Sequence, residues 1–332
     1  MRKILHMQRI IFLMLGCGGL LMLSGCQGEN SRLDQQLKDE RTVVLGFAQV
    51  GAESSWRLSN TQSIKEAASA EGMQLMYINA EQKQDNQIKA IRSFIAYQVD
   101  AILLSPVIET GWENVLNEAK LADIPVILTD REIKTEQPDL YRCFVGSDFH
   151  KEGKMAGEFL KKKFKGYKEE INIVELYGTI GSSPAEGRSR GFKEVIKENP
   201  NFRVICSRSG DFMHSKGKEI MKDILDEYQD IDVLYSHNDS MTLGAIEAME
   251  EVGIRPGKDI IIITIDGEQK IIDALKQGKV NCVIECNPKL GDTIVDLTKR
   301  LLKGENIPRT VFVEDMVFTE WDDLSLIAPR GY

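Results

Sequence analysis

Short apolar runs alternate with stretches of helical period along nearly the whole chain after Thr42. "TVVLGFAQV" is followed by the helix-like "TQSIKEAASAEG", "MQLMYIN" by "DNQIKAIRSFIAYQ", and the pattern continues as far as "VNCVIEC". The runs are apolar throughout rather than at every second residue, which indicates strands buried on both faces of a parallel sheet. Strand–helix alternation builds such sheets through right-handed crossovers. The sequence therefore predicts an α/β fold.

The number of repeats indicates two lobes. The alternation comprises roughly ten units, too many for one ordinary open sheet, and it restarts after "YRCFVGSD". About 290 residues remain for folding beyond residue 41, more than one core usually serves. We predict two doubly wound parallel-sheet lobes in tandem.

The first 25 residues carry the features of a secretory signal. Three positive residues precede an apolar stretch of 14 residues, 10–23. A membrane-spanning helix needs ~20 apolar residues, whereas a signal peptide needs fewer. The stretch closes with "LSGC", which resembles the lipobox of bacterial lipoproteins. The resemblance implies that residues 1–25 are removed, that Cys26 is lipidated and that residues 26–41 form a polar tether; a retained signal anchor is the alternative.

Charge and cysteine content exclude several classes of function. The net charge is −9, and it becomes −12 without the signal, which holds three positive and no negative charges. An acidic chain without a basic run has no electrostatic footprint for nucleic acid. No cysteine spacing fits a zinc site, and we expect the four cysteines of the folded part to be structural, with any pairing left open: Cys143, Cys206, Cys282 and Cys286.

Polar and aromatic residues follow seven of the predicted strands. Ligands of open parallel sheets lie outside the carboxyl ends of the strands, so these residues are the candidate binding site. Some could instead cap helices, because Asn and Asp favour that position; capping is the better interpretation for Asp239, which directly precedes "SMTLGAIEAM". The candidates, in chain order, are Glu53, Ser55, Trp56, Arg57, Asp130, Arg131, Arg188, Asp211, Phe212, Asn238, Asp266 and Glu285.

These residue types suit a neutral sugar. Carboxylates and guanidinium groups form strong hydrogen bonds with hydroxyls, and Trp56 and Phe212 offer flat faces to a sugar ring. Three arginines could instead indicate an anionic ligand, but Glu53, Asp130 and Asp266 balance their charge. Motifs of enzymes are missing: "GIRPGKD" lacks the spacing of a phosphate loop, and no GxGxxG or HExxH occurs. We therefore predict a binding protein without cofactor or metal.

The same stretches resemble a known family, the ribose/galactose-binding (type I) sugar-binding proteins and lipoproteins of ABC transporters, and in particular its galactofuranose-binding branch. The resemblance extends over residues 42–332 and is carried by "GFAQVGAESSWR", "SGDFMHSKGKEIM", "YSHNDSMTLGAIEAM", "PGKDIIIITIDG" and the closing "GY". It implies an extracytoplasmic, monomeric protein that delivers a monosaccharide to an ABC permease. Ser55 and "SPAEGR" depart from the branch in the ligand neighbourhood, so galactose, arabinose and other aldoses remain candidates.

The resemblance also implies two lobes joined by three crossings, which we place near Gly146, Cys286 and Ile307. The first lobe would comprise residues 42–146 and 287–307, and the second 147–286 and 308–332. Closure about this hinge would bring ligand contacts from both sides. A sugar sensor for a membrane histidine kinase or chemoreceptor could share every pocket residue and is the alternative function. A repressor core of the same fold is excluded, since a secretion signal replaces its DNA-binding helices.

The lipobox makes a direct prediction. Cys26→Ser removes the thiol that lipid would modify, so the variant should lose metabolic labelling with a radioactive fatty acid and leave the membrane fraction for the soluble one. A variant that stays in the membrane fraction and keeps its signal would contradict the lipobox interpretation and favour a retained anchor.

Overall fold

The computed structural model describes residues 41–332. The predicted signal peptide, the predicted lipidation site Cys26 and all but the last residue of the predicted tether lie outside the described residues. Within the described part, none of the helices combines the length and the apolarity that crossing a bilayer requires.

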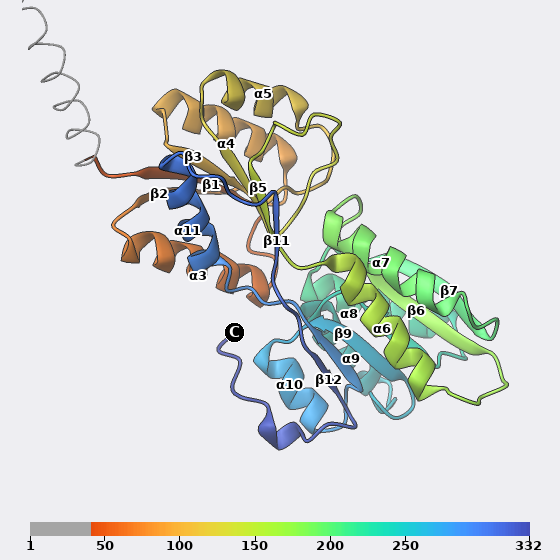
Figure 1. Ribbon diagram of the computed structural model, residues 1–332. Coiled ribbons are helices and arrows are strands. Elements are labelled where there is room, and N and C mark those ends of the chain that lie inside the picture. Colours follow the sequence, from red (N-terminus) through yellow and green to blue (C-terminus); the bar gives the residue numbers. More distant parts are fainter. Residues whose placement is uncertain (1–40) are drawn as a thin grey trace, which may run out of the picture. The chain divides into compact units, whose positions relative to one another are not determined.

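The first sheet has six strands in the order β11-β5-β4-β3-β1-β2, all parallel. Figure 1 shows α3 and α11 together on one face of this sheet and α4 and α5 on the other. The elements are β1 Val44–Gln49, α3 Ser55–Ala70, β2 Gln74–Asn79, α4 Gln84–Tyr97, β3 Ala101–Leu104, α5 Glu113–Leu121, β4 Val126–Thr129, β5 Cys143–Gly146, α11 Gly291–Leu302 and β11 Thr310–Phe312.

The second sheet has the order β12-β10-β9-β8-β6-β7, with only the edge strand β12 antiparallel. Helices α6 and α7 pack against each other, as do α8 and α9 (Figure 1). The elements are α6 Phe149–Lys163, β6 Ile171–Tyr177, α7 Ser183–Ile196, β7 Phe202–Ser209, α8 His214–Glu227, β8 Val233–Ser236, α9 Asp239–Glu251, β9 Ile261–Asp266, α10 Gln269–Lys276, β10 Cys282–Glu285, β12 Val317–Thr319 and the short 3₁₀ helix Leu324–Leu326.

The two sheets confirm the predicted α/β fold. Every residue of β3, β4, β5, β8 and β10 is buried, as the continuously apolar runs predicted for strands covered on both faces. The four cysteines of the described part are buried free thiols.

The chain passes between the sheets three times: after β5, after β10 and after β11. The third passage corrects the prediction, which placed it near Ile307 and assigned residues 308–332 to the second lobe. Instead β11 pairs with β5 in the first sheet, and only β12 joins the second. The reason is that β5 would otherwise be a bare edge; Phe144 N donates to Arg309 O at 2.9 Å and Val313 N to Gly146 O at 3.0 Å.

One polar group from each passage meets at the hinge. Ser147 Oγ donates to Asp315 Oδ1 at 3.0 Å and lies 3.5 Å from Cys286 Sγ. Burial, with the nearby Glu152 carboxyl adding to it, raises the pKa of Asp315 to about 8. The three connections are therefore held together by side chains as well as by the two sheets.

Glycines allow the helices of the second lobe to approach closely. A Cβ added to Gly153 of α6 would lie 2.1 Å from Arg188 O, and one added to Gly191 of α7 would lie 2.0 Å from His150 O. Any side chain at either position would therefore force the helices apart. This contact sets Arg188 of α7 directly against α6, on which Glu152 lies.

Gly191→Ala tests this packing. Alanine favours a helix over glycine by ~1 kcal/mol, but its Cβ would collide with backbone of α6, so we expect a net loss of about 2 kcal/mol in the free energy of unfolding. Urea unfolding followed by circular dichroism measures it. The control is Ser69→Ala on the exposed side of α3, which should change the midpoint little; an unchanged midpoint for Gly191→Ala would show that the helices can separate without cost.

Candidate functional site

Strand ends of both sheets converge on one small pocket. The free space within it is about 20 Å³, room for roughly one water molecule, because side chains from both lobes fill it. Nine of the twelve predicted site residues line it. The lining residues are Glu53, Ser54, Trp56, Arg57, Asp130, Arg131, Pro184, Arg188, Phe212, Asn238, Asp266 and Cys286.

Local backbone geometry brings several of these side chains to the pocket. Ser54 is the N-cap of α3, and its Oγ accepts from Arg57 N at 3.1 Å, so Trp56 and Arg57 lie in the first helical turn, just beyond the end of β1. Of the eight non-glycine residues with positive φ in the described part, four are predicted site residues: Asp130, Asp211, Phe212 and Asp266. Such strained residues cluster at functional sites.

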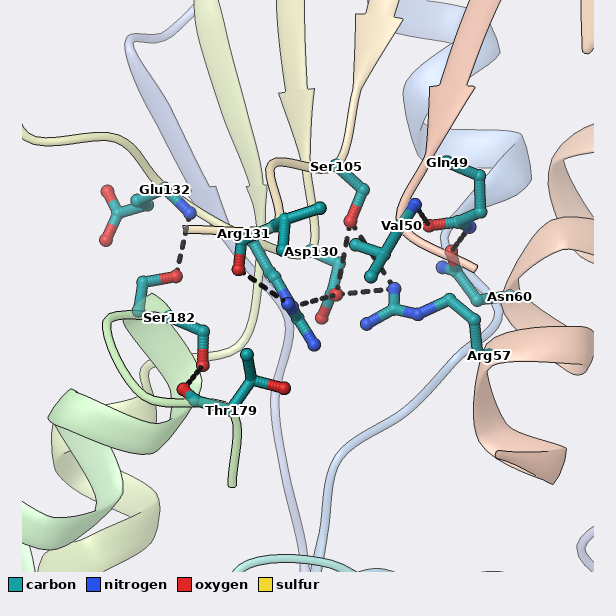
Figure 2. A network of polar contacts seen from close by, with 12 residues as sticks. Gln49, Val50, Arg57, Asn60, Ser105, Asp130, Arg131, Glu132, Thr179 and Ser182 are labelled. Atoms are coloured by element: carbon teal, nitrogen blue, oxygen red, sulfur yellow. Dashed lines mark hydrogen bonds and ion pairs between the residues drawn. The ribbon is translucent and has the colours of Figure 1, made fainter. Parts of the chain in front are cut away.

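The first lobe neutralises Arg57 with two carboxylates. Arg57 Nη1 donates to Asp130 Oδ2 at 2.6 Å and its Nε donates to Glu53 Oε1 at 2.9 Å. Figure 2 shows Arg57 reaching from α3 toward Asp130, with Ser105 and Arg131 beside them. Burial opposes the charged form, but Asp130 and Glu53 outweigh it and raise the pKa of Arg57. This guanidinium is therefore a fixed, fully paired cation.

Arg131 is the less compensated cation of the first lobe. Its Nη1 donates to Val107 O at 3.0 Å, but its guanidinium comes no closer than 3.8 Å to Glu53 and Asp130. Burial, together with the neighbouring charge of Arg57, lowers the pKa of Arg131 to about 10. Among the described residues, nothing hydrogen-bonds to Arg131 Nε or to Glu53 Oε2, both of which are buried. Two residues that line the pocket thus carry a buried donor and a buried acceptor that remain unused.

The second lobe neutralises Arg188 in a similar way. Arg188 Nε donates to Glu152 Oε2 at 2.7 Å, and its Nη1 donates to His237 O at 2.6 Å. Its Nη2 lies 3.7 Å from Asp266 Oδ1. Burial raises the pKa of Asp266, against the opposing pull of Arg188. The arginine is thereby held between α6 and the end of β8 and faces the pocket.

Phe212 lies between arginines of the two lobes. Its ring centroid is 5.3 Å from Arg131 Cζ and 6.0 Å from Arg188 Cζ, within the usual range of cation–π contacts. Asn238 Nδ2 donates to the Phe212 backbone oxygen at 3.2 Å and so holds this turn. Asn238 is also the N-cap of α9, its Oδ1 accepting from Met241 N, which corrects the prediction that Asp239 caps this helix.

Three predicted site residues do not line the pocket. Ser55 is exposed at the start of α3. The Asp211 carboxylate turns to Lys216 Nζ, 2.5 Å away. Glu285 forms an ion pair with Arg330 and accepts from Met316 N at 3.1 Å. Position at a strand end alone reveals none of these directions: Ser55 begins a helix, Asp211 has a partner five residues away, and Glu285 has one that is distant in sequence.

Three lining residues were not predicted from the sequence, nor was Glu152, which does not line the pocket but pairs with Arg188. Ser54 and Pro184 lie within the stretches "ESSWR" and "SPAEGR" that were singled out, and Cys286 was placed at the hinge, so each had a positional signal. No signal in the sequence pointed to Glu152, because only the close packing of α6 on α7 brings it to Arg188. Its other oxygen, Oε1, has no hydrogen-bond partner among the described residues.

The described residues offer no metal-binding cluster, and the buried histidine beside the pocket is paired with a carboxylate. Within residues 41–332 no group of three or more His, Cys, Asp and Glu side chains could hold a metal ion. His237 is buried and its Nε2 faces Glu175 Oε1 at 3.1 Å. Burial lowers the pKa of this imidazole. What the pocket offers is paired charges, two unused polar atoms and two aromatic rings.

Comparison with known proteins identifies the family. A family model described as a periplasmic binding protein domain matches residues 45–306. The galactofuranose-binding protein YtfQ of Escherichia coli is 44% identical, over 80% of this chain and 84% of the relative.

Solved structures agree with this assignment. A protein of Mycobacterium smegmatis in complex with β-D-fucofuranose superposes with a TM-score of 0.83 at 46% identity, over 84% of this chain and 92% of that one. The binding protein of the arabinose ABC transporter from Shewanella sp. ANA-3, bound to α- and β-L-arabinofuranose, gives 0.80 at 42% identity, again over 84% and 92%. The predicted family is thus confirmed, and the chain belongs to the periplasmic-binding-protein family of sugar-binding proteins.

Proposed function

We propose that this protein captures a neutral aldose in its furanose form between its two lobes and delivers it to an ABC permease. The observation that carries the proposal is the balance of charge in the pocket: three guanidinium groups and three carboxyl groups line it. An anionic sugar would meet several carboxylates at short range. A neutral sugar fits, because its hydroxyls donate to carboxylates and accept from guanidinium groups.

Two unused polar atoms could form hydrogen bonds with the hydroxyls of a sugar. Glu53 Oε2 is a free acceptor and Arg131 Nε a free donor, and both are buried. Leaving such groups without a partner costs about 1–3 kcal/mol each, so a ligand that supplies the missing hydrogen bonds gains affinity. Trp56 and Phe212 would cover the faces of the sugar ring. The free volume of about 20 Å³ is smaller than a sugar ring, so we expect the lobes or the side chains between them to move apart when a sugar binds.

The relatives support the furanose form and the transport role. The three proteins compared above carry descriptions that name galactofuranose, fucofuranose and arabinofuranose, and the third is described as a component of an ABC transporter. All three are described by what they bind, in keeping with a protein that binds and does not catalyse.

The cellular setting completes the proposal. Membership of this family implies an extracytoplasmic location. We further propose that lipid on Cys26 tethers the protein to the membrane, that residues 27–41 let the lobes reach the permease, and that it acts as a monomer. The "LSGC" motif and the polar stretch after it support the anchor.

Two substitutions test the pocket from opposite lobes. Arg131→Ala and Asp266→Ala should each weaken sugar binding by ~2 kcal/mol or more, because each leaves buried polar partners unsatisfied. Calorimetry against L-arabinose, D-galactose and D-fucose measures the loss. Unfolding of the free protein should change little, since these groups become hydrated when the lobes separate.

Matched controls sharpen the test. Asp211→Ala removes a carboxylate that the structure turns toward Lys216, and Arg203→Ala removes an arginine paired with Glu170 on the surface. Both should keep the affinity of the unaltered protein to within about twofold. If Asp211→Ala weakened binding as much as Asp266→Ala, the pocket would have been placed wrongly.

A further inference from the structure

The start of α3 is held by the other lobe. The backbone N–H of Trp56, in the first turn of α3, donates to Glu268 Oε1 at 2.9 Å. Glu268 follows β9 of the second sheet, is 2% exposed and does not line the pocket. The indole Nε1 of the same tryptophan donates to Cys286 O at the hinge. Trp56 is therefore held by its backbone and by its side chain, and both acceptors lie outside the first lobe.

Glu268 supplies the carboxylate that the first turn of α3 lacks. The first N–H groups of a helix have no partner within it and carry partial positive charge, which favours a carboxylate nearby. No acidic residue lies in the first turn of α3, and the side chain of its N-cap, Ser54, accepts from Arg57 N and leaves Trp56 N to another acceptor. The carboxylate that meets the free N–H group comes from a residue 212 positions away. This hydrogen bond also joins the two lobes at the helical turn that holds Trp56 and Arg57.

The position of Glu268 is fixed from within its own lobe. It is the N-cap residue of α10, yet its side chain makes no capping hydrogen bond there. Its backbone N–H and that of Gly267 both donate to Asp239 Oδ2 at 2.7 Å. From the other side Arg330 Nε donates to Gly267 O, and Gln269 N donates to Tyr332 O. The turn is thus braced by α9 and by the C-terminal residues, leaving the carboxyl group aimed at α3.

Without its contact to α3, the group of buried carboxyl groups around Glu268 would lower the stability of the second lobe. Burial raises the pKa of Glu268, and it also raises the pKa of Asp239 and Asp266, which lie in the same turn or bind it. Three buried carboxyl groups so close together would not be expected for stability of the second lobe by itself. Contact with α3 gives one of them a partner.

We propose that Glu268 is a positioning residue for sugar binding: it docks on the N-terminus of α3 when the lobes close, orients Trp56 and Arg57 toward the ligand and slows release of the sugar without touching it. The inference rests on the proposed function. Because the contact joins the two lobes, it contributes to the closed state and is lost as they separate.

The kinetics of sugar release test the role. In stopped-flow measurements following tryptophan fluorescence with L-arabinose, D-galactose or D-fucose, whichever the unaltered protein binds, Glu268→Ala should raise the dissociation rate about tenfold, the effect of losing one charge-assisted hydrogen bond. The association rate should change less than about threefold, since encounter precedes closure. Glu268→Gln should restore slow release to within about threefold, because its amide oxygen can still accept from Trp56 N–H.

Two controls separate positioning from general stability. Glu247→Ala, which removes a surface carboxylate paired with Lys218, should leave both rates unchanged. The thermal midpoint of the sugar-free Glu268→Ala protein should stay close to that of the unaltered protein. If its midpoint falls while the dissociation rate does not change, the contact is structural in both states and the inference is wrong.

The remaining outcomes distinguish this inference from the proposed function. An unaltered protein that binds sugar, with a Glu268→Ala variant that releases it equally slowly, would overturn the inference alone. A Glu268→Gln variant that releases sugar as fast as Glu268→Ala would show that hydrogen bonding to Trp56 is not what matters. An unaltered protein that binds none of the sugars would overturn the proposed function, and this role with it.

Discussion

Burial of three guanidinium groups in one pocket is the constraint on which the rest of the structure depends. An arginine removed from water is tolerated only with a well-placed counter-charge. Each lobe supplies its own: Glu53 and Asp130 for Arg57, and Glu152 with the more distant Asp266 for Arg188. Each lobe therefore supplies carboxylates for its own buried arginines, whereas Glu268 of the second lobe has its partner on α3 of the first. Arg131, with its lowered pKa and unused Nε, is the cation left for a ligand to satisfy.

This division of charge explains why closure can depend on the sugar. Direct contacts between the lobes in the described part of the chain include Glu268 on α3, the Glu132 N–H on Ser183 Oγ at 2.8 Å, the Glu109 N–H on Gly181 O at 2.8 Å, and the Phe212 ring near Arg131. A ligand shifts an equilibrium between two states only by the difference in its contacts with them. In the proposed function, a neutral sugar would supply that difference by bonding to Glu53 and Arg131 on one side and to Asp266 on the other.

Much of this could be read from the sequence, and the failures have physical reasons. Continuously apolar runs identified the strands, and the rule that parallel strands present ligands at their carboxyl ends located most of the pocket. Glu152 escaped because its role depends on glycine-mediated helix packing. Glu285 was predicted to line the pocket, but its carboxylate forms an ion pair with Arg330, which is distant in sequence. The separation of β11 from β12 was missed because membership of a sheet is decided by pairing between distant segments, which local pattern does not encode.

The central claim, a charge-balanced pocket for a neutral sugar, is tested most directly by the salt dependence of binding. Calorimetry with a neutral aldose at ~50 and ~500 mM salt should give affinities that agree within about twofold, because an uncharged ligand brings no net charge to be screened. The phosphate of the same sugar should not bind. Tight binding of a sugar phosphate or uronic acid that weakens steeply with salt would contradict the account.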